Sequence, residues 1–434
     1  MQSALMSLRL NFMLDRVIIK NISSLFSIRI AGYVIPLLTL PYLVRVLDPQ
    51  GYGTFIYCVA ICQYFIIAVN YGFDLSATKL IAEEKNDINI VSSLFWNVFS
   101  IRLTIALVGF IILYLVSFIS DEINNLFSIL SYCYISAIAA AFFPQWLFQG
   151  KEQLGVISIV RVVSQIVTIP FIFILVKDEN DINIVAFLTS LPCVVVAIFS
   201  SILIHKRHWL VFCKPSLNKM IEQIVNGWHV FISTAAISLY TTSTVVVLGI
   251  TCGPASVGIY ASANKLLQAA IGILTPVTAS FYPRINSLLK DDEGKAIDLI
   301  RYALKVLISI TFLMAFCIYF LSPFIVELLY GEKFSRSAVL LQLMSVLPLL
   351  VSLSSVFGLL VLLPFDLKKQ YTKIYLFSGV LSLTMVTILS KYFDAEGAAV
   401  SMVLTEILVL TLMALVIRAK KIPVFNNSVS TQSS

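Results

Sequence analysis

The residues best suited to chemistry are arginines that lie inside otherwise apolar stretches of the sequence. Arg29, Arg102 and Arg161 each lie about seven residues from the same end of their stretch, which is ~10 Å at the rise of an α-helix. A charge at the middle of a membrane costs on the order of 2.5–3.5 kcal/mol. Because a guanidinium group forms two parallel hydrogen bonds with phosphate oxygens, three at one level predict an anion-binding ring. The alternative is that each long side chain extends back to the membrane surface.

Lys265, Glu406 and Asp74 are the other charged candidates. Lys265 lies near the middle of its apolar stretch, where extension to the surface is harder, so we expect it to face an internal cavity. Glu406 lies near the middle of the last stretch. It either pairs with Lys265 or another cation or carries a proton in a coupled cycle, and the sequence leaves both open. Asp74 follows the second stretch and is expected to pair with a nearby lysine or arginine.

Motifs of common membrane enzymes are missing from the sequence. It contains no G-x-x-x-x-G-K-[ST], no H-E-x-x-H and no G-x-S-x-G. Its 7 cysteines stand singly or loosely spaced, which is neither a disulfide nor a zinc pattern. We therefore expect a protein that is not an enzyme, with no catalytic residue, no metal, no other cofactor and no nucleic acid partner.

The composition is that of a membrane protein. Of the 434 residues, 59% are hydrophobic and 12% are charged, compared with about 45–50% and 25% in soluble domains. Stretches long enough to cross a bilayer predict an all-α polytopic membrane protein with about twelve spans. They lie near residues 22–44, 52–72, 94–118, 126–148, 154–176, 183–204, 227–250, 256–280, 302–321, 337–362, 372–390 and 396–418.

The positions of lysines and arginines predict the orientation. If the amino terminus is cytoplasmic, about twenty of these residues fall in inner connections and about five in outer ones, as the positive-inside rule requires. Both termini are therefore expected in the cytoplasm.

A repeat at one constant offset divides the chain. It pairs Pro49 with Pro254 and Gly53 with Gly258, so that Pro-x-x-x-Gly-x-aromatic occurs in the turn of both first hairpins. Such parallel repeats are related by an axis along the membrane normal. We expect two pseudo-symmetric lobes of about six helices around a central cavity: residues 1–220 form the first lobe, and residues 221–434 form the second with a cytoplasmic tail.

Four short motifs stand between Asn21 and Lys79: N-x-x-S-L, P-L-L-T-L-P-Y-L-x-R-V-L, P-x-G-Y-G-x-F and Y-G-F-x-L-S-A-T-K. Together they closely resemble the amino-terminal signature of the Wzx-type polysaccharide flippases, in the superfamily of multidrug, oligosaccharidyl-lipid and polysaccharide exporters. Pro36 and Pro41 predict a broken first helix. Asp48 stands where the family leads us to expect glycine, so the turn need not have the same backbone shape.

The resemblance implies a V-shaped pair of helix bundles. It also implies a function: an undecaprenyl-pyrophosphate-linked oligosaccharide repeat unit, of O-antigen or a similar surface polysaccharide, moves across the bacterial inner membrane by alternating access. The predicted cations would then hold the pyrophosphate. The partners would be this lipid-linked sugar and the bilayer, with other polysaccharide assembly proteins left open. Trp146, after Pro144, would either anchor a helix at the membrane surface or stack on a sugar ring.

Two other functions remain as alternatives. A multidrug antiporter of the same superfamily would present buried carboxylates to cationic drugs, whereas this chain presents mainly buried cations. A membrane glycan polymerase or ligase would share the substrate, but we would expect a sizeable outer loop, and the outer connections here are short.

Overall fold

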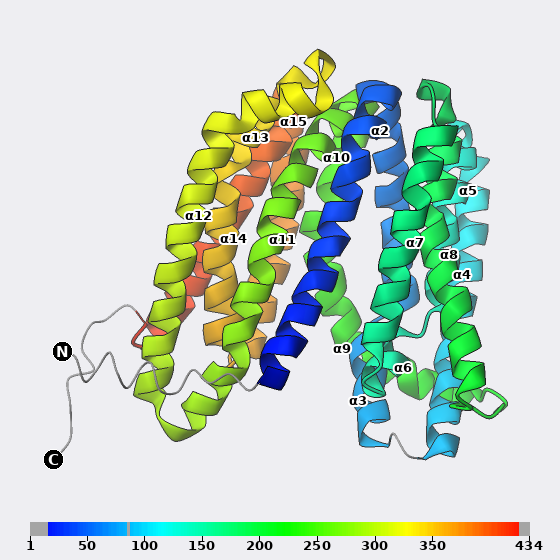
Figure 1. Ribbon diagram of the computed structural model, residues 1–434, viewed down its shortest axis with the longest axis vertical. Helices are drawn as coiled ribbons and strands as arrows, with labels where there is room; N and C mark the ends of the chain where they lie inside the picture. Colours follow the sequence, from blue (N-terminus) through cyan, green and yellow to red (C-terminus); the bar gives the residue numbers. More distant parts are fainter. Residues whose placement is uncertain (1–15, 85–86, 425–434) are drawn as a thin grey trace.

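The computed structural model describes residues 16–84 and 87–424 (Figure 1). Side chains before Ile35 and at a few positions of the later helices lie outside this description. Every regular element in the described part is helical. The main helices are α2 (Arg16–Asn70), α3 (Phe73–Glu83), α4 (Ile88–Ser117), α5 (Asp121–Phe142), α6 (Gln145–Gly150), α7 (Leu154–Leu175), α8 (Ile182–Lys206), α9 (Leu217–Thr241), α10 (Ser243–Cys252), α11 (Pro254–Asp291), α12 (Glu293–Tyr330), α13 (Ser335–Leu343), α14 (Leu347–Ser355) and α15 (Lys368–Ala419). Short 3-10 segments, Glu179–Asp181, Glu332–Phe334 and Met344–Val346, and a π-helical segment, Val356–Leu362, complete the chain.

Nine helical segments of the described chain are long and apolar enough to cross a membrane. The two longest of the helices concerned, α2 and α15, contain enough residues for two crossings each. A straight helix of 52 residues, the length of α15, would measure about 78 Å against a hydrocarbon core of ~30 Å. Both α2 and α15 contain one residue with non-helical backbone angles, Asp48 in α2 and Asp394 in α15, and each helix turns back on itself there.

The expected break in the first helix is not found where the prolines predict it. α2 keeps helical backbone angles through Pro36 and Pro41, and only Asp48 departs from them. A proline removes one backbone hydrogen bond, but its fixed φ is itself close to the helical value. The prediction of a broken helix at these two prolines was therefore wrong.

The bundle has two ends, which we name by residues. At the Asp48 end, α2 and α15 turn back and the short α13 begins; at the Arg16 end, α2 begins, α15 finishes, and α3 and α6 lie (Figure 1). We call residues 16–220 the first half and residues 221–424 the second half of the described chain.

The hydrophobic cores differ between the two ends. One cluster at the Asp48 end contains buried side chains of both halves, among them Leu47 and Tyr52 from α2 and Val257 and Tyr260 from α11. Towards the Arg16 end, a second cluster takes its buried residues from 73–204 and a third takes its own from 285–424. The halves therefore share a core at one end and keep separate cores at the other.

The repeated turns have nearly the same backbone. Asp48 has φ 55° and ψ 172°, and Gly253 has φ 88° and ψ 175°. Each residue precedes a proline, Pro49 or Pro254, at the start of the next helical segment, a position that suits proline. Although Asp48 stands where glycine was expected, its turn resembles the glycine turn of the second repeat, because Asp48 adopts a conformation that glycine takes without strain.

Candidate functional site

Arg102 of α4 is buried, with 2% of its surface exposed. Its guanidinium donates hydrogen bonds to the carbonyl oxygens of Ala140 (2.6 Å) and Phe143 (3.1 Å) and to Oδ1 of Asn70 (2.6 Å). The two carbonyls belong to the last turn of α5, which stops before Pro144. Each carbonyl also accepts a hydrogen bond from one backbone N–H, that of Phe143 or Gln145, so Arg102 supplies a second donor, and a cation there interacts favourably with the helix dipole. Arg102 therefore caps α5.

Asp74, in the first turn of α3, lies near Arg102. The two charges attract each other, although no direct ion pair joins them. Oδ1 of Asp74 and Nε of Arg102 are both buried and make no hydrogen bond of their own. The expected ion pair of Asp74 with a lysine or arginine is not found among the described residues; Asp74 lies only within electrostatic reach of the arginine that caps α5.

Arg161 of α7 reaches the same place from another side. Its side chain is exposed, and the guanidinium carbon lies 6.0 Å from the centre of the Phe143 ring. Arg102 binds the carbonyl of this phenylalanine and Arg161 lies over its ring, so the two arginines meet at one level. Arg29 belongs to α2, but its side chain lies outside the described residues.

Lys265 of α11 is exposed, although protein atoms surround it on most sides. It makes no ion pair within the described residues. Its neighbours Asn264 and Gln268 bond to each other, with the side-chain amide of Gln268 donating over 3.4 Å. No contact links Lys265 with Arg102 or Arg161.

Glu406 of α15 is 5% exposed and lies beside Ser354 of α14. No ion pair of Glu406 occurs in the described part of the chain, with Lys265 or with any other cation. The sequence left open whether Glu406 pairs with a cation or carries a proton, and the described part of the structure offers no cation for the first role.

Trp146 is buried within the protein, so its ring is not available to a ligand. It is 1% exposed and lies in the core towards the Arg16 end, 5.9 Å from the ring of Phe95. Both interpretations of this tryptophan were wrong, because α6 folds it inward.

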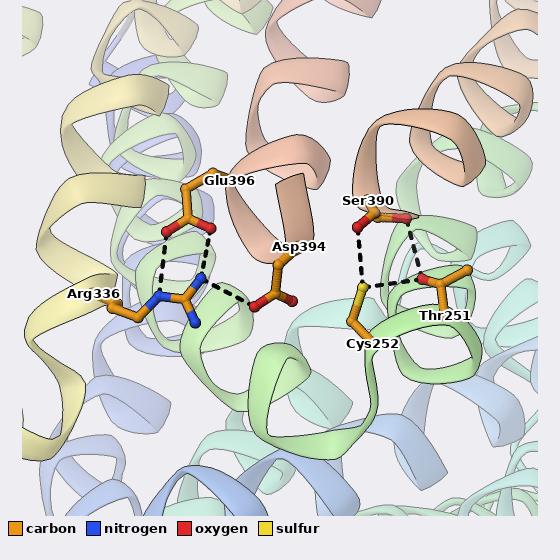
Figure 2. A network of polar contacts seen from close by, with 6 residues as sticks. All are labelled: Thr251, Cys252, Arg336, Ser390, Asp394 and Glu396. Carbon is orange, nitrogen blue, oxygen red and sulfur yellow. Dashed lines mark hydrogen bonds and ion pairs between the residues drawn. The ribbon is translucent and has the colours of Figure 1, made fainter. Parts of the chain in front are cut away.

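The sequence reasoning missed a set of charged contacts at the Asp48 end. Arg336 binds Glu396 through Nε (3.3 Å) and Nη2 (2.7 Å) and also binds Asp394 (3.0 Å), as Figure 2 shows. Nearby in the same view, Thr251 and Cys252 at the end of α10 bond to Ser390. These contacts join elements of the second half only.

Other contacts at this end join the two halves. Lys333 pairs with Asp48, and Arg45 donates hydrogen bonds to the carbonyl oxygens of Leu328 and Leu329 near the end of α12. The only signal in the sequence for these contacts between the halves was Asp48, which stands where a glycine was expected. No group of histidine, cysteine or acidic residues in the described chain is arranged to hold a metal.

Comparisons with known proteins give consistent similarities. Residues 18–289 match the model of a family described as polysaccharide biosynthesis protein. A protein of Escherichia coli (strain K12) described as "Putative O-antigen transporter" is 34% identical over 404 residues, which cover 93% of this chain and 97% of that protein.

Two solved structures have the same fold at low sequence identity. An inward-facing multidrug resistance transporter of the MATE family has a TM-score of 0.74 at 15% identity, covering 89% of this chain and 95% of its own. The lipid II flippase MurJ, in an inward closed conformation, has a TM-score of 0.69 at 14% identity, covering 91% of this chain and 86% of its own.

Proposed function

Because this chain belongs to the Wzx-type polysaccharide flippases of the multidrug, oligosaccharidyl-lipid and polysaccharide exporter superfamily, we propose that it flips a lipid-linked oligosaccharide across a bacterial inner membrane. The protein is a multi-pass membrane transporter and not an enzyme. The cargo of the proposal is an undecaprenyl-pyrophosphate-linked repeat unit of O-antigen or a similar surface polysaccharide, and the process is alternating access. Its partners are this lipid and the bilayer.

The proposal includes about twelve crossings in two lobes, divided near residues 220 and 221. Nine apolar segments of the described chain are long enough to cross a membrane. Dividing α2 at Asp48 and α15 at Asp394 raises this number to eleven, and counting α9 and α10 together as one interrupted crossing gives twelve. The shared core at the Asp48 end and the separate cores at the other end support a V that is joined at the Asp48 end. Most lysines and arginines fall in the connections predicted to be inner, which supports a cytoplasmic location for the Arg16 end and for both termini.

One observation carries the function: Arg161 and Lys265 are exposed cations on membrane-spanning helices of opposite halves, and no acid pairs with either in the described residues. Keeping such charges in a membrane is costly, and a pyrophosphate would neutralise them. Arg29 is included among the proposed anion-binding cations because the sequence places it at the same depth as Arg102 and Arg161. Arg102, whose hydrogen bonds go to protein acceptors, would position the Phe143 region and leave anion binding to Arg161.

The alternatives lack comparable support. An antiporter for cationic drugs needs accessible acids within its spans, and Glu406 is buried. A polymerase or ligase needs a large outer loop, but α4 and α5 are joined by residues 118–120 and α12 leads into the next helical segment through Gly331 alone. Glu406 stays in the proposal as a proton-carrying coupling residue.

The test is complementation of a cell that lacks its repeat-unit flippase, with surface polysaccharide as the readout and protein amount measured by immunoblot. Arg161→Ala and Lys265→Ala should each lower export about tenfold or more at normal protein amounts, as expected for losing a charged hydrogen bond of about 1.5–3 kcal/mol.

Matched controls are Arg284→Ala and Lys305→Ala, which remove exposed cations of the same types outside the proposed group. These should export normally. Export at the wild-type level in both Arg161→Ala and Lys265→Ala would contradict anion binding by these residues.

A further inference from the structure

The two repeated turns contact each other through their glycines. A Cβ atom added to Gly53 would overlap the carbonyl oxygen of Pro254 and lie 2.7 Å from the backbone nitrogen of Gly258. A Cβ atom added to Gly258 would overlap the carbonyl oxygen of Pro49 and lie 3.1 Å from the backbone nitrogen of Gly53. We call these four residues the glycine crossing. Equivalent residues of the two repeats thus make equivalent contacts on each other.

The glycine crossing brings two helix backbones together without side chains between them. Small residues allow such close approach in membrane proteins, where Cα–H···O contacts and packing hold helices together. The contact itself is made by backbone atoms, and side chains of both halves, among them Tyr52 and Val257, lie in the shared core at the same end. The approach is so close that even a methyl group would force the two backbones apart.

The ion pair between Asp48 and Lys333 lies beside the glycine crossing. Asp48 occupies a backbone region that is almost exclusive to glycine and costs other residues about 1–3 kcal/mol. The equivalent residue of the second repeat, Gly253, has the same kind of conformation without that cost. What Asp48 adds is a carboxylate that pairs with a residue of the other half. Strain held at a functional contact is a common reason for such an outlier.

We infer that the glycine crossing and the Asp48–Lys333 pair form the gate at the Asp48 end. This inference rests on the proposed function, because a cargo that enters between separate cores at the Arg16 end must leave where the halves now touch. Arg45 adds a second polar contact between the halves, to the end of α12. The gate closes through backbone contact and is held by polar bonds at its edge.

The gate can be tested by distance measurements across the Asp48 end of the purified full-length protein in lipid nanodiscs. Labels attached through unnatural amino acids at the exposed positions Asn180 and Lys391, one in each half, leave the native cysteines in place. In Gly258→Ala, the population with a long distance should rise about tenfold or more, because overpacking against a backbone cannot be relieved by a side-chain movement. Export should fall with it.

Gly155→Ala is the matched control, because a Cβ atom added to Gly155 meets nothing within 4 Å. It should change neither the distances nor export. Unchanged distances in Gly258→Ala, or an equal change in Gly155→Ala, would overturn the gate and leave the glycine crossing as a permanent joint.

Asp48→Gly is the second variant, and it keeps the test valid if Gly258→Ala does not fold. Glycine takes the backbone conformation freely, so only the ion pair is lost, and the long-distance population should rise about two- to fivefold. No rise would overturn the role of the ion pair. The distances are measured without cargo, so a wild-type chain that opens here but exports no polysaccharide would refute the proposed function and not the gate.

Discussion

At the Asp48 end, one hydrophobic core holds both halves of the chain together, whereas towards the Arg16 end each half has a core of its own. The contacts that accompany the cores differ as well. At the Asp48 end the halves meet through backbone contact and polar bonds. Towards the Arg16 end, α9 makes the link, because Phe231 of this helix stacks on Tyr71 of the first half.

The difference shows which parts can move as units. Each separate core can stay intact while the distance between the two changes, because few side chains are shared between them. The shared core must part if the Asp48 end is to open. Stability within a half and the balance between arrangements of the halves should therefore respond to different residues.

The largest effect is expected for Arg102→Ala, which damages one of the separate cores. The carbonyls of Ala140 and Phe143 and the amide oxygen of Asn70 would each lose a charged donor. The free energy of unfolding should fall by about 3 kcal/mol or more, because three hydrogen bonds from a buried charged group would be lost. Thermal unfolding of the detergent-solubilised protein, together with its amount in membranes, measures this loss.

Arg161→Ala is the control for this prediction. It removes the same residue type at the same level, but from an exposed position over Phe143. Its thermal stability should stay at the wild-type value while export falls. Wild-type stability in Arg102→Ala would show that the capping of α5 contributes little.

The behaviour of Arg102 shows how far the sequence could predict the site. Counting residues along apolar stretches placed Arg102 and Arg161 at one level, and the structure brings both to Phe143. It could not tell which of them turns inward. That depends on carbonyl groups that become available only because α5 ends before Pro144, far along the chain from Arg102.

The fold followed from the sequence more directly, because its signals are local. Apolar length predicted a helical membrane protein, and nine helical segments of the described chain are long and apolar enough to cross a membrane. The pairing of Pro49 with Pro254 and of Gly53 with Gly258 predicted related turns, which have similar backbones. The burial of Trp146 was not predictable in the same way. A residue pattern cannot show that α6 folds beneath its neighbours, since this depends on tertiary packing.

A smaller effect is expected for Arg336→Ala, which breaks contacts inside the second half at the Asp48 end. Arg336 joins α13 to the turn of α15 through Glu396 and Asp394 (Figure 2). The side chain is partly exposed, so the loss in stability should be about 1 kcal/mol. The distance between labels at Asn180 and Lys391 should not change, because no contact between the halves is lost.

Lys333→Ala gives the opposite pattern. Its partner Asp48 lies in the other half, so the long-distance population should rise while thermal stability stays close to the wild-type value. If both variants shift the distance equally, the distinction between contacts within a half and contacts between halves is wrong.

The smallest effect is expected where Tyr64 of α2 and Ser243 of α10 share a hydrogen bond, with 2.5 Å between their hydroxyl oxygens. This bond joins the halves farther from Asp48 than the glycine crossing does. Hydrogen bonds between membrane helices contribute about 0.6 kcal/mol on average, so Tyr64→Phe should shift the distance populations about threefold towards the open arrangement. Ser243→Ala should give the same shift, because it removes the same bond.

The double variant decides whether the bond itself is responsible. Once one hydroxyl is gone, removing the other should add nothing, whereas independent contributions would multiply to about ninefold. A multiplied shift would mean that the two residues act separately. An unchanged population in both single variants would mean that Tyr64 and Ser243 stay together when the Asp48 end opens, and the boundary between the moving parts would then lie between this bond and the glycine crossing.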